Sequence, residues 1–306
     1  YARAGGLFAA AIERAPGDSE ALALFSLNHR RLGHFGEAVD TLAKAMALDP
    51  ASAALRWPSY QHALFYLRRY ADAAAGGERQ IALLPVLARN SAFVRHTAIA
   101  RFEVDSDRNR LFERLRNLPE DDANPERIAG RYIAALYAGD LAEAERLLSS
   151  SRIPPTAQFE IDTNPLNPIG LERALVACLR GNTKLAAEHA ASVEAFLRQG
   201  NWTGNVRWNS RGQLVRVAAY TGNKAEALRL ATELRRDIAG KDFQTELGEL
   251  NRLGRTYALL SERDEALAIL RKLMTGPSIT AFAGSPRLIR HRERRLVGRP
   301  GRLRDR

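Results

Sequence analysis

The sequence predicts an all-α fold, an α-solenoid in which antiparallel helix hairpins stack into a right-handed superhelix. Two observations lead to this prediction. Pro16, Pro50 and Pro85 recur at intervals of 34 and 35 residues, which indicates a repeated unit of that length. No stretch of useful length alternates apolar with polar residues as a β-strand would, so helices are the expected elements. One hairpin cannot bury its apolar stripe alone, and neighbouring units therefore stack in series.

The segment 19–52 is the clearest of these units. Its second half carries Ala38 and Ala45, small residues that let two antiparallel helices approach closely. Gly33 can adopt the positive φ that ends a helix, so the chain is expected to reverse there. Pro50 cannot continue a helix and sets the end of the unit.

This unit resembles a tetratricopeptide repeat, a hairpin of two helices about 34 residues long. Leu22, Phe25 and Ser26 stand at core positions of the family's first helix and keep its pairing of large with small side chains. Residues 1–16 resemble the second half of a unit, and residues 54–87 resemble a further complete one. The resemblance implies a superhelix whose first helices line a concave groove for a partner.

The pattern divides the chain into four segments. Residues 1–87 are expected to form repeat-like hairpins, the first of them truncated, and residues 88–151 divergent hairpins. Residues 152–283 are expected to form hairpins of longer period, and residues 284–306 a basic, disordered tail.

Turn residues and long connections are expected in the second half of the chain. The predicted turn positions are Gly139, Gly181, Gly222 and Ser261. Segments 152–170 and 199–212, rich in proline and in glycine respectively, are expected to be loops. Trp202 and Trp208 are expected to pack at the edge of the solenoid, with a recognition loop on the ligand-facing side as the alternative.

The net charge of +11 in 306 residues is concentrated at one end of the chain. Residues 285–306 hold nine arginines against two acidic residues, which is +7 of that total. The remainder of the chain is close to neutral for its size, so nucleic acid is an expected partner only for the tail. No run of 18 or more apolar residues predicts a membrane-spanning helix.

Residue types that carry out catalysis do not converge in the sequence. His29 and His34 lie five residues apart, whereas a zinc-binding helix spaces its histidines by four. Cys178 is the one cysteine, which excludes a disulfide framework and a cysteine-based zinc site, and its apolar surroundings predict that it behaves as a small hydrophobic side chain. We expect no catalytic residue, no cofactor and no metal, and therefore a protein that is not an enzyme.

The expected function is that of a protein–protein interaction scaffold, which binds a peptide or helix in the groove. The family's groove positions, transferred to this sequence, give Leu27, Arg30, Arg31, His62, Phe65, Tyr66, Ile133 and Tyr137. They form a mixed surface of apolar, aromatic and cationic side chains, and each could instead pack on the next hairpin.

The alternative function is a regulatory or sensory tail of a larger signalling protein. Residues 256–280 resemble the last repeat of bacterial tails that follow a Ser/Thr kinase, a nucleotide cyclase or a winged-helix regulator. The chain begins at Tyr1, inside an expected helix and without a methionine, which favours a fragment of such a protein. The expected compartment is the cytoplasm, and the oligomeric state stays open.

Overall fold

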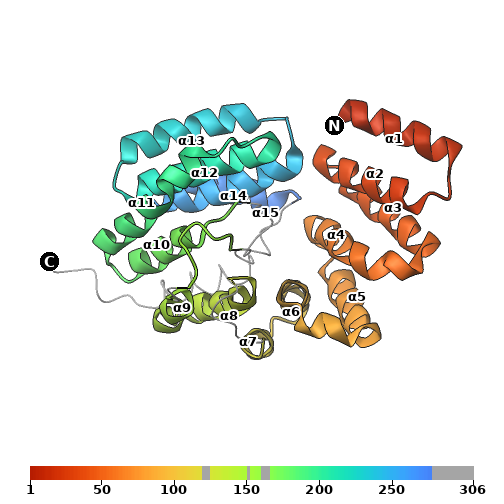
Figure 1. Ribbon diagram of the computed structural model, residues 1–306, viewed down its shortest axis with the longest axis horizontal. Helices are drawn as coiled ribbons and strands as arrows, with labels where there is room; N and C mark the ends of the chain where they lie inside the picture. The colour runs from red at the N-terminus through yellow and green to blue at the C-terminus, as the bar shows by residue number, and fades with distance from the viewer. Residues whose placement is uncertain (119–124, 150–151, 160–165, 278–306) are drawn as a thin grey trace.

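The computed structural model describes residues 1–118, 125–149, 152–159 and 166–277, and these form fifteen α-helices (Figure 1). The helices are α1 Ala2–Arg14, α2 Ser19–Leu32, α3 Phe35–Leu48, α4 Ala53–Tyr66, α5 Tyr70–Leu83, α6 Ser91–Asp105, α7 Arg108–Arg116, α8 Pro125–Ala138, α9 Leu141–Leu148, α10 Ile169–Leu179, α11 Thr183–Gln199, α12 Gly204–Tyr220, α13 Lys224–Ile238, α14 Phe243–Leu259 and α15 Arg263–Thr275. The described part of the chain has no β-strand, only an isolated bridge between Gln158 and Pro168. The predicted all-α solenoid is confirmed.

The helices pair into seven antiparallel hairpins, from α2 with α3 to α14 with α15, and α1 precedes them as a second helix. We call the even-numbered helices first helices and the odd-numbered ones second helices. The expected division into four segments stays a prediction, and its last segment, 284–306, lies outside the described residues.

Each hairpin turns at a residue with positive φ. These residues are Gly33, Arg68, Ser106, Gly139, Gly181, Gly222 and Ser261. The five turn positions predicted from the sequence are therefore confirmed, including Ser261, whose φ is 63°. The left-handed conformation reverses the chain within one or two residues, so consecutive helices lie side by side.

Prolines and acidic or amide side chains set the helix ends. Pro50 and Pro85 each open a short 3₁₀ helix, η1 Pro50–Ser52 and η2 Pro85–Arg89, just after α3 and α5 end. At seven of the described α-helix N-termini, a side-chain oxygen accepts a hydrogen bond from a backbone N–H group of the first turn. These N-cap residues are Asp18, Asn90, Asp107, Asp140, Asn182, Asn223 and Asp242.

Helices approach most closely where the chain has small residues. Ala38, Ala45 and Ala73 are all buried at crossings, as their positions in the repeat predict. A Cβ atom on Gly76 would lie 1.9 Å from the ring of Trp57, so glycine is required where α5 passes under that ring.

One predicted loop is largely helical. The segment expected as a loop at 199–212 is helical from Gly204, and Gly212 lies inside α12. A Cβ atom at Gly212 would lie 2.0 Å from the carboxylate of buried Glu249, so this glycine serves close packing and not a turn. Trp202 packs on Phe196 with ring centroids 5.3 Å apart and donates to the Leu197 carbonyl, as expected for a tryptophan at the solenoid edge.

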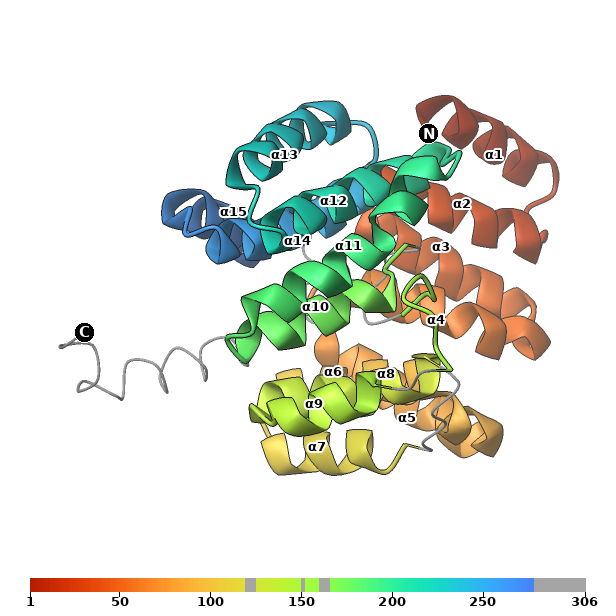
Figure 2. The same cartoon turned by 60° about the vertical axis from the view of Figure 1, so that its left-hand side comes forward.

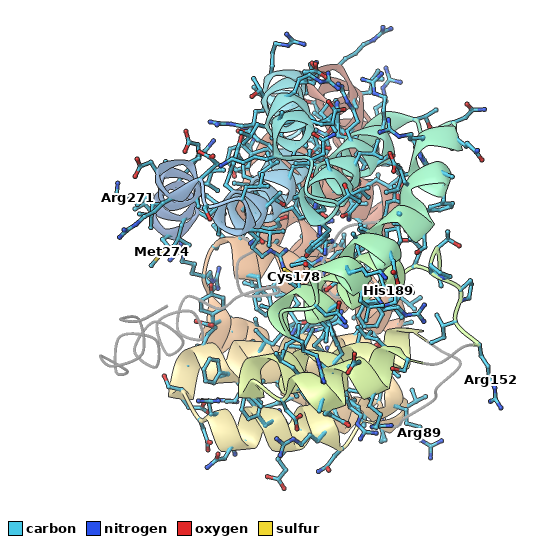
Figure 3. All side chains as sticks on the ribbon, turned by 90° about the vertical axis from the view of Figure 1, so that its left-hand side faces the viewer. Arg89, Arg152, Cys178, His189, Arg271 and Met274 are labelled. Atoms are coloured by element: carbon cyan, nitrogen blue, oxygen red, sulfur yellow. The ribbon has the colours of Figure 1, made fainter. Side chains whose placement is uncertain are left out.

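The solenoid closes on itself, because α14 packs against α2. Arg31 on α2 lies 2.8 Å from the carboxylate of Asp242, the N-cap of α14, and the Tyr1 hydroxyl donates to the same carboxylate at 3.1 Å. The ring of Phe243 lies over Gly33 and 5.9 Å from the ring of Phe35. Figures 1 and 2 show the resulting ring of hairpins from two directions, and Figure 3 shows it with its side chains.

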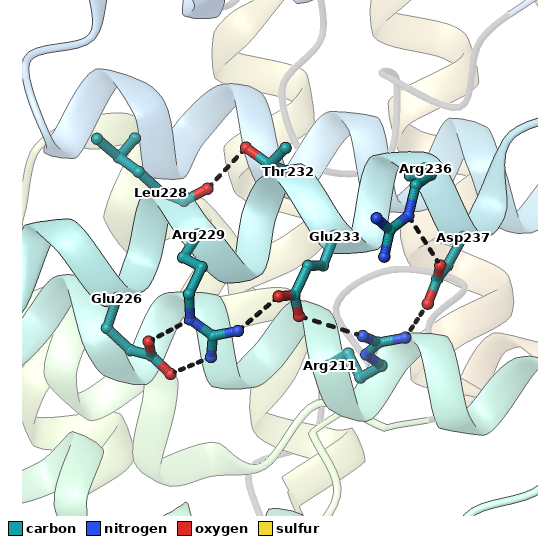
Figure 4. Close-up of polar contacts among 8 residues, drawn as sticks. All are labelled: Arg211, Glu226, Leu228, Arg229, Thr232, Glu233, Arg236 and Asp237. Carbon is teal, nitrogen blue, oxygen red and sulfur yellow. Dashed lines mark hydrogen bonds and ion pairs between the residues drawn. The ribbon is translucent and has the colours of Figure 1, made fainter.

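Ion pairs on the surface fix the second helix α13 to its first helix. Arg211 of α12 lies between Glu233 and Asp237 of α13, and Arg229 binds Glu226 and Glu233 along α13 itself (Figure 4). Exposed pairs of this kind each contribute little, and a chain of them contributes more through shared geometry.

We expect Ser261→Gly to raise the free energy of unfolding by about 0.5–1 kcal/mol, because glycine adopts the left-handed turn without the strain of a Cβ atom. Gly222→Ala, at the equivalent turn of the preceding hairpin, should lower it by about 1–2 kcal/mol. Urea denaturation measures both values. Equal effects of the two substitutions would contradict this account of the turns.

We expect Asp242→Ala to lower the free energy of unfolding by about 3 kcal/mol, since it removes a helix cap and the buried partner of Arg31. Asp140→Ala removes an exposed N-cap on α9, away from the α2–α14 contact. It should lower the free energy of unfolding by only about 1 kcal/mol. Small-angle scattering should show a larger radius for the Asp242 variant alone. Matching losses and radii in both variants would refute the closure.

Candidate interaction surface

The first helices lie beside one another, as α2 does with α4 and α14 and as α12 does with α10 and α14. Within the described residues, no buried polar or charged side chain lies on a second helix. These side chains are Ser26, Asn28, Arg30, Gln61, Arg95, His96, Thr97, Glu103, Asn167, Glu172, Asn209, Ser210, Gln213, Asp242, Thr245, Glu249, Arg252 and Thr256. Asn167 and Asp242 come just before α10 and α14. The polar face of the first helices is thus enclosed.

A buried carboxylate links three consecutive first helices. Glu172 of α10 accepts a hydrogen bond from the Tyr132 hydroxyl of α8 at 2.9 Å and lies 2.9 Å from the guanidinium of Arg216 of α12. Burial and the charge of Glu172 raise the pKa of Tyr132 well above its usual range, so this hydroxyl keeps its proton and donates it. The cluster is a structural joint between hairpins.

A second carboxylate, Glu249 of α14, acts in the same way at the next joint. It is fully buried, accepts from the amide of Asn209 on α12 and pairs with Arg252 one turn along its own helix. Each buried carboxylate therefore forms an ion pair with an arginine and accepts a hydrogen bond from a neutral donor. A buried charge needs such partners to offset the loss of its hydration.

Four of the predicted groove residues are core residues in the structure. Phe65, Tyr66 and Ile133 have exposed fractions of 0%, 1% and 5%. Tyr66 stacks on Phe35 with ring centroids 4.1 Å apart. Arg30 is also buried, and its guanidinium donates to the backbone carbonyl of Ser59 at 3.2 Å.

His62 is half-buried, and its ring lies 5.1 Å from the ring of His96 on α6. Burial, followed by the charges of Arg30 and Arg95, lowers the pKa of His62 to about 3. This imidazole is neutral at physiological pH. The side chain of Tyr137, another predicted groove residue, lies outside the described part of the chain.

The last two predicted groove residues are accessible. Leu27 is 36% exposed, and Leu24, one turn before it on α2, is exposed as well. Arg31, one turn after Leu27, is half-buried in its pair with Asp242. The structure thus brings Leu27 and Arg31 together beside the α2–α14 contact, whereas Phe65, Tyr66 and Ile133 lie in the interior. That these residues contact a partner stays a prediction.

Large exposed apolar side chains are unevenly distributed. Of the twelve within the described residues, nine lie in residues 1–86 and only Val104, Leu179 and Leu259 lie beyond. The nine are Tyr1, Leu7, Leu24, Leu27, Leu48, Leu55, Leu83, Leu84 and Val86. Exposed apolar side chains concentrated in this way are typical of interaction sites.

Five of these nine belong to one edge of the ring. The end of α3, the start of α4 and the end of α5 meet there because the three helices are antiparallel in turn. We call the five residues Leu48, Leu55, Leu83, Leu84 and Val86 the rim set. Leu55, Leu83 and Val86 are 84%, 72% and 70% exposed. The repeat pattern makes Leu55 a groove position of the family, and it carries no expectation for the other four, which occupy helix ends and connections.

Within the described residues, no group of three or more histidine, cysteine, aspartate or glutamate side chains is placed to hold a metal ion. Cys178 on α10 is half-buried, and burial raises the pKa of its thiol (Figure 3). None of the helices in the described ranges is long and apolar enough to cross a membrane.

Comparisons with known proteins give a structural likeness and no match in sequence. No protein-family model and no curated protein sequence matches the chain. Among solved structures, the chain is similar to the crystal structure of a tetratricopeptide repeat protein from Parabacteroides merdae ATCC 43184, with a TM-score of 0.45 and 13% identity. The match covers 89% of this chain and 96% of that chain. The α-solenoid fold is established by the helix hairpins and positive-φ turns of this chain itself.

We expect Phe65→Ala to lower the free energy of unfolding by about 3–5 kcal/mol, because it opens a cavity in the core. Leu27→Ala should lower it by less than about 1 kcal/mol, because this side chain is already in contact with water. Urea denaturation of the two variants compares these losses. A small loss for Phe65→Ala would place this ring on the surface and contradict its burial.

Proposed function

We propose that the chain is a non-catalytic protein–protein interaction scaffold that binds a peptide or a helix of a partner protein. The observation that carries this proposal is the concentration of exposed apolar side chains in residues 1–86. Water contact at such side chains is unfavourable, and burying one leucine against a partner contributes about 1.5–3 kcal/mol. A few such anchors suffice for specific binding.

The helix hairpins keep these anchors in place before a partner arrives. Leu24 and Leu27 share one face of α2, and the rim set is held by the ends of α3, α4 and α5. Binding to a preformed surface avoids much of the entropy lost when flexible segments become ordered. This rigidity supports a scaffold rather than a segment that folds on its partner.

The buried charged side chains hold neighbouring hairpins together, which is a structural role. Glu172 and Glu249 link neighbouring first helices through cations and neutral donors in the interior. Such joints stabilise the stacking of hairpins, which is the requirement of a scaffold. The regulatory or sensory tail of a larger signalling protein stays the alternative prediction, and a partner-binding surface at residues 1–86 would serve it equally.

Site-specific photo-crosslinking tests the proposal. A photoreactive amino acid is placed at position 27, 55 or 86 in the full chain, and adducts are identified in cells of the source organism. We expect one partner protein to be captured from these positions. Leu55→Glu should weaken capture of that partner at least tenfold, because a buried carboxylate opposes docking.

Position 259 supplies the matched control, since Leu259 is 38% exposed and Leu27 is 36% exposed. We expect no adduct with the partner from position 259 and unchanged capture in Leu259→Glu. Capture from position 27 but not from 55 and 86 would assign the partner to the face of α2 that carries Leu24 and Leu27, instead of to the rim set. The scaffold proposal fails if all four positions capture the same background proteins.

A further inference from the structure

Exposed cations accompany the leucines of the rim set on α3 and α5. Lys44 lies one helical turn before Leu48 on α3, and Arg79 lies one turn before Leu83 on α5. Residues four positions apart on an α-helix share a face, so each cation is a neighbour of its leucine. The same pairing of a positive charge with an exposed leucine therefore occurs on two consecutive second helices.

A third cation lies on η2. Arg89 follows Val86 by three residues, which is the spacing at which side chains of a 3₁₀ helix align. Figure 3 shows Arg89 pointing away from the helices. We call Lys44, Arg79 and Arg89 the rim cations. All three are exposed, and none forms an ion pair with a carboxylate in the described part of the chain.

The arginine between the rim set and α2 is occupied by the protein itself. The guanidinium of Arg56 lies 3.3 Å from the carboxylate of Asp49, which directly follows Leu48, and 3.4 Å from that of Glu20. Arg56 also donates to the Ala45 carbonyl at 3.1 Å, and its side chain is only 11% exposed. The rim cations are thus the positive charges of this edge that a partner can reach.

The exposed leucines on α2 have a different electrostatic setting. Glu20 lies one turn before Leu24, and Arg31, one turn after Leu27, lies 2.8 Å from the carboxylate of Asp242. These leucines therefore have a carboxylate and a paired arginine as neighbours. Accessible positive charge beside exposed apolar side chains distinguishes the rim set from α2.

We propose that the rim set binds an acidic peptide segment of the partner protein, in which apolar side chains alternate with aspartate or glutamate. This inference rests on the proposed function and names the chemistry of the partner. The apolar side chains of the segment cover Leu55, Leu83 and Val86, the most exposed members of the rim set. Its carboxylates lie opposite the rim cations, and such charge complementarity fixes the orientation of the segment.

An anionic lipid surface also combines apolar groups with negative charge. Asp49 and Glu20 favour the peptide, because a continuous layer of anionic headgroups would approach these carboxylates as well as the rim cations. A peptide can place its acidic residues opposite the cations alone and avoid the like charges. The mixed charge pattern of this edge therefore fits a segment of defined sequence.

Phage display of short random peptides on the full chain tests the proposal. We expect the selected peptides to be enriched in aspartate and glutamate next to leucine or phenylalanine. A rim variant that carries Lys44→Gln, Arg79→Gln and Arg89→Gln should bind the best of them about tenfold more weakly in fluorescence anisotropy, because three ion pairs are lost. Added salt should weaken binding to the unchanged chain and affect the rim variant much less.

A control variant carries Lys184→Gln, Arg235→Gln and Arg271→Gln, and so loses the same charge from exposed positions on α11, α13 and α15. Arg271 lies on the opposite side of the molecule from Arg89 (Figure 3). We expect this variant to bind the selected peptides with unchanged affinity. Equal affinities of the two triple variants, or selected peptides without an excess of acidic residues, would overturn the proposal.

Vesicles of phosphatidylserine and phosphatidylcholine distinguish a lipid surface from a peptide. We expect the full chain not to sediment with them. Sedimentation that the control variant keeps and the rim variant loses would assign the rim cations to a membrane and reject the peptide. Photo-crosslinking separates this proposal from the scaffold proposal. A partner captured equally by both triple variants leaves the scaffold in place and refutes acidic recognition, whereas capture of no partner refutes the scaffold itself.

Discussion

The contact between α2 and α14 is the constraint on which the rest of the structure depends. Asp242 caps the N-terminus of α14 and also accepts hydrogen bonds from Arg31 and Tyr1, so one buried carboxylate begins a helix and joins the two ends of the array. In an open solenoid the terminal hairpins leave an apolar face uncovered unless a polar capping unit protects it. In the closed ring, α2 and α14 cover each other, so no polar capping unit is required to protect these two helices.

Closure also explains why, in the described part of the chain, the buried polar side chains of the helices all lie on first helices. A first helix packed against its own second helix and against other first helices has little free surface, so Glu172 and Glu249 must find partners inside the protein. Aromatic residues expected to face a groove, Phe65 and Tyr66, become part of the core for the same reason. Accessible apolar surface is left on α2, at Leu24 and Leu27, and at the helix ends where the rim set lies.

Features that depend on local conformation could be predicted from the sequence. Gly33 and Ser261 were recognised as turns because the repeat places a left-handed residue between two apolar helical stripes, and φ is positive at both. Arg68 and Ser106 take the same conformation without a sequence signal, held by the hairpins on either side. The Arg31–Asp242 pair spans 211 positions, and no local pattern reports such a contact. The groove positions transferred from the family include Phe65 and Tyr66, and both side chains are buried, because burial depends on how neighbouring hairpins pack and not on the local pattern.

Departures from regular repeat packing occur at α9 and at the rim set. Stability in a repeat array comes from each hairpin and its contacts with its neighbours, so a shortened α9 and exposed leucines at helix ends remove apolar burial that a regular unit would have. At α9 the loss is partly offset, because Arg173 donates hydrogen bonds to the carbonyl of Leu148, the last residue of the helix, and to the carbonyl of Ile153.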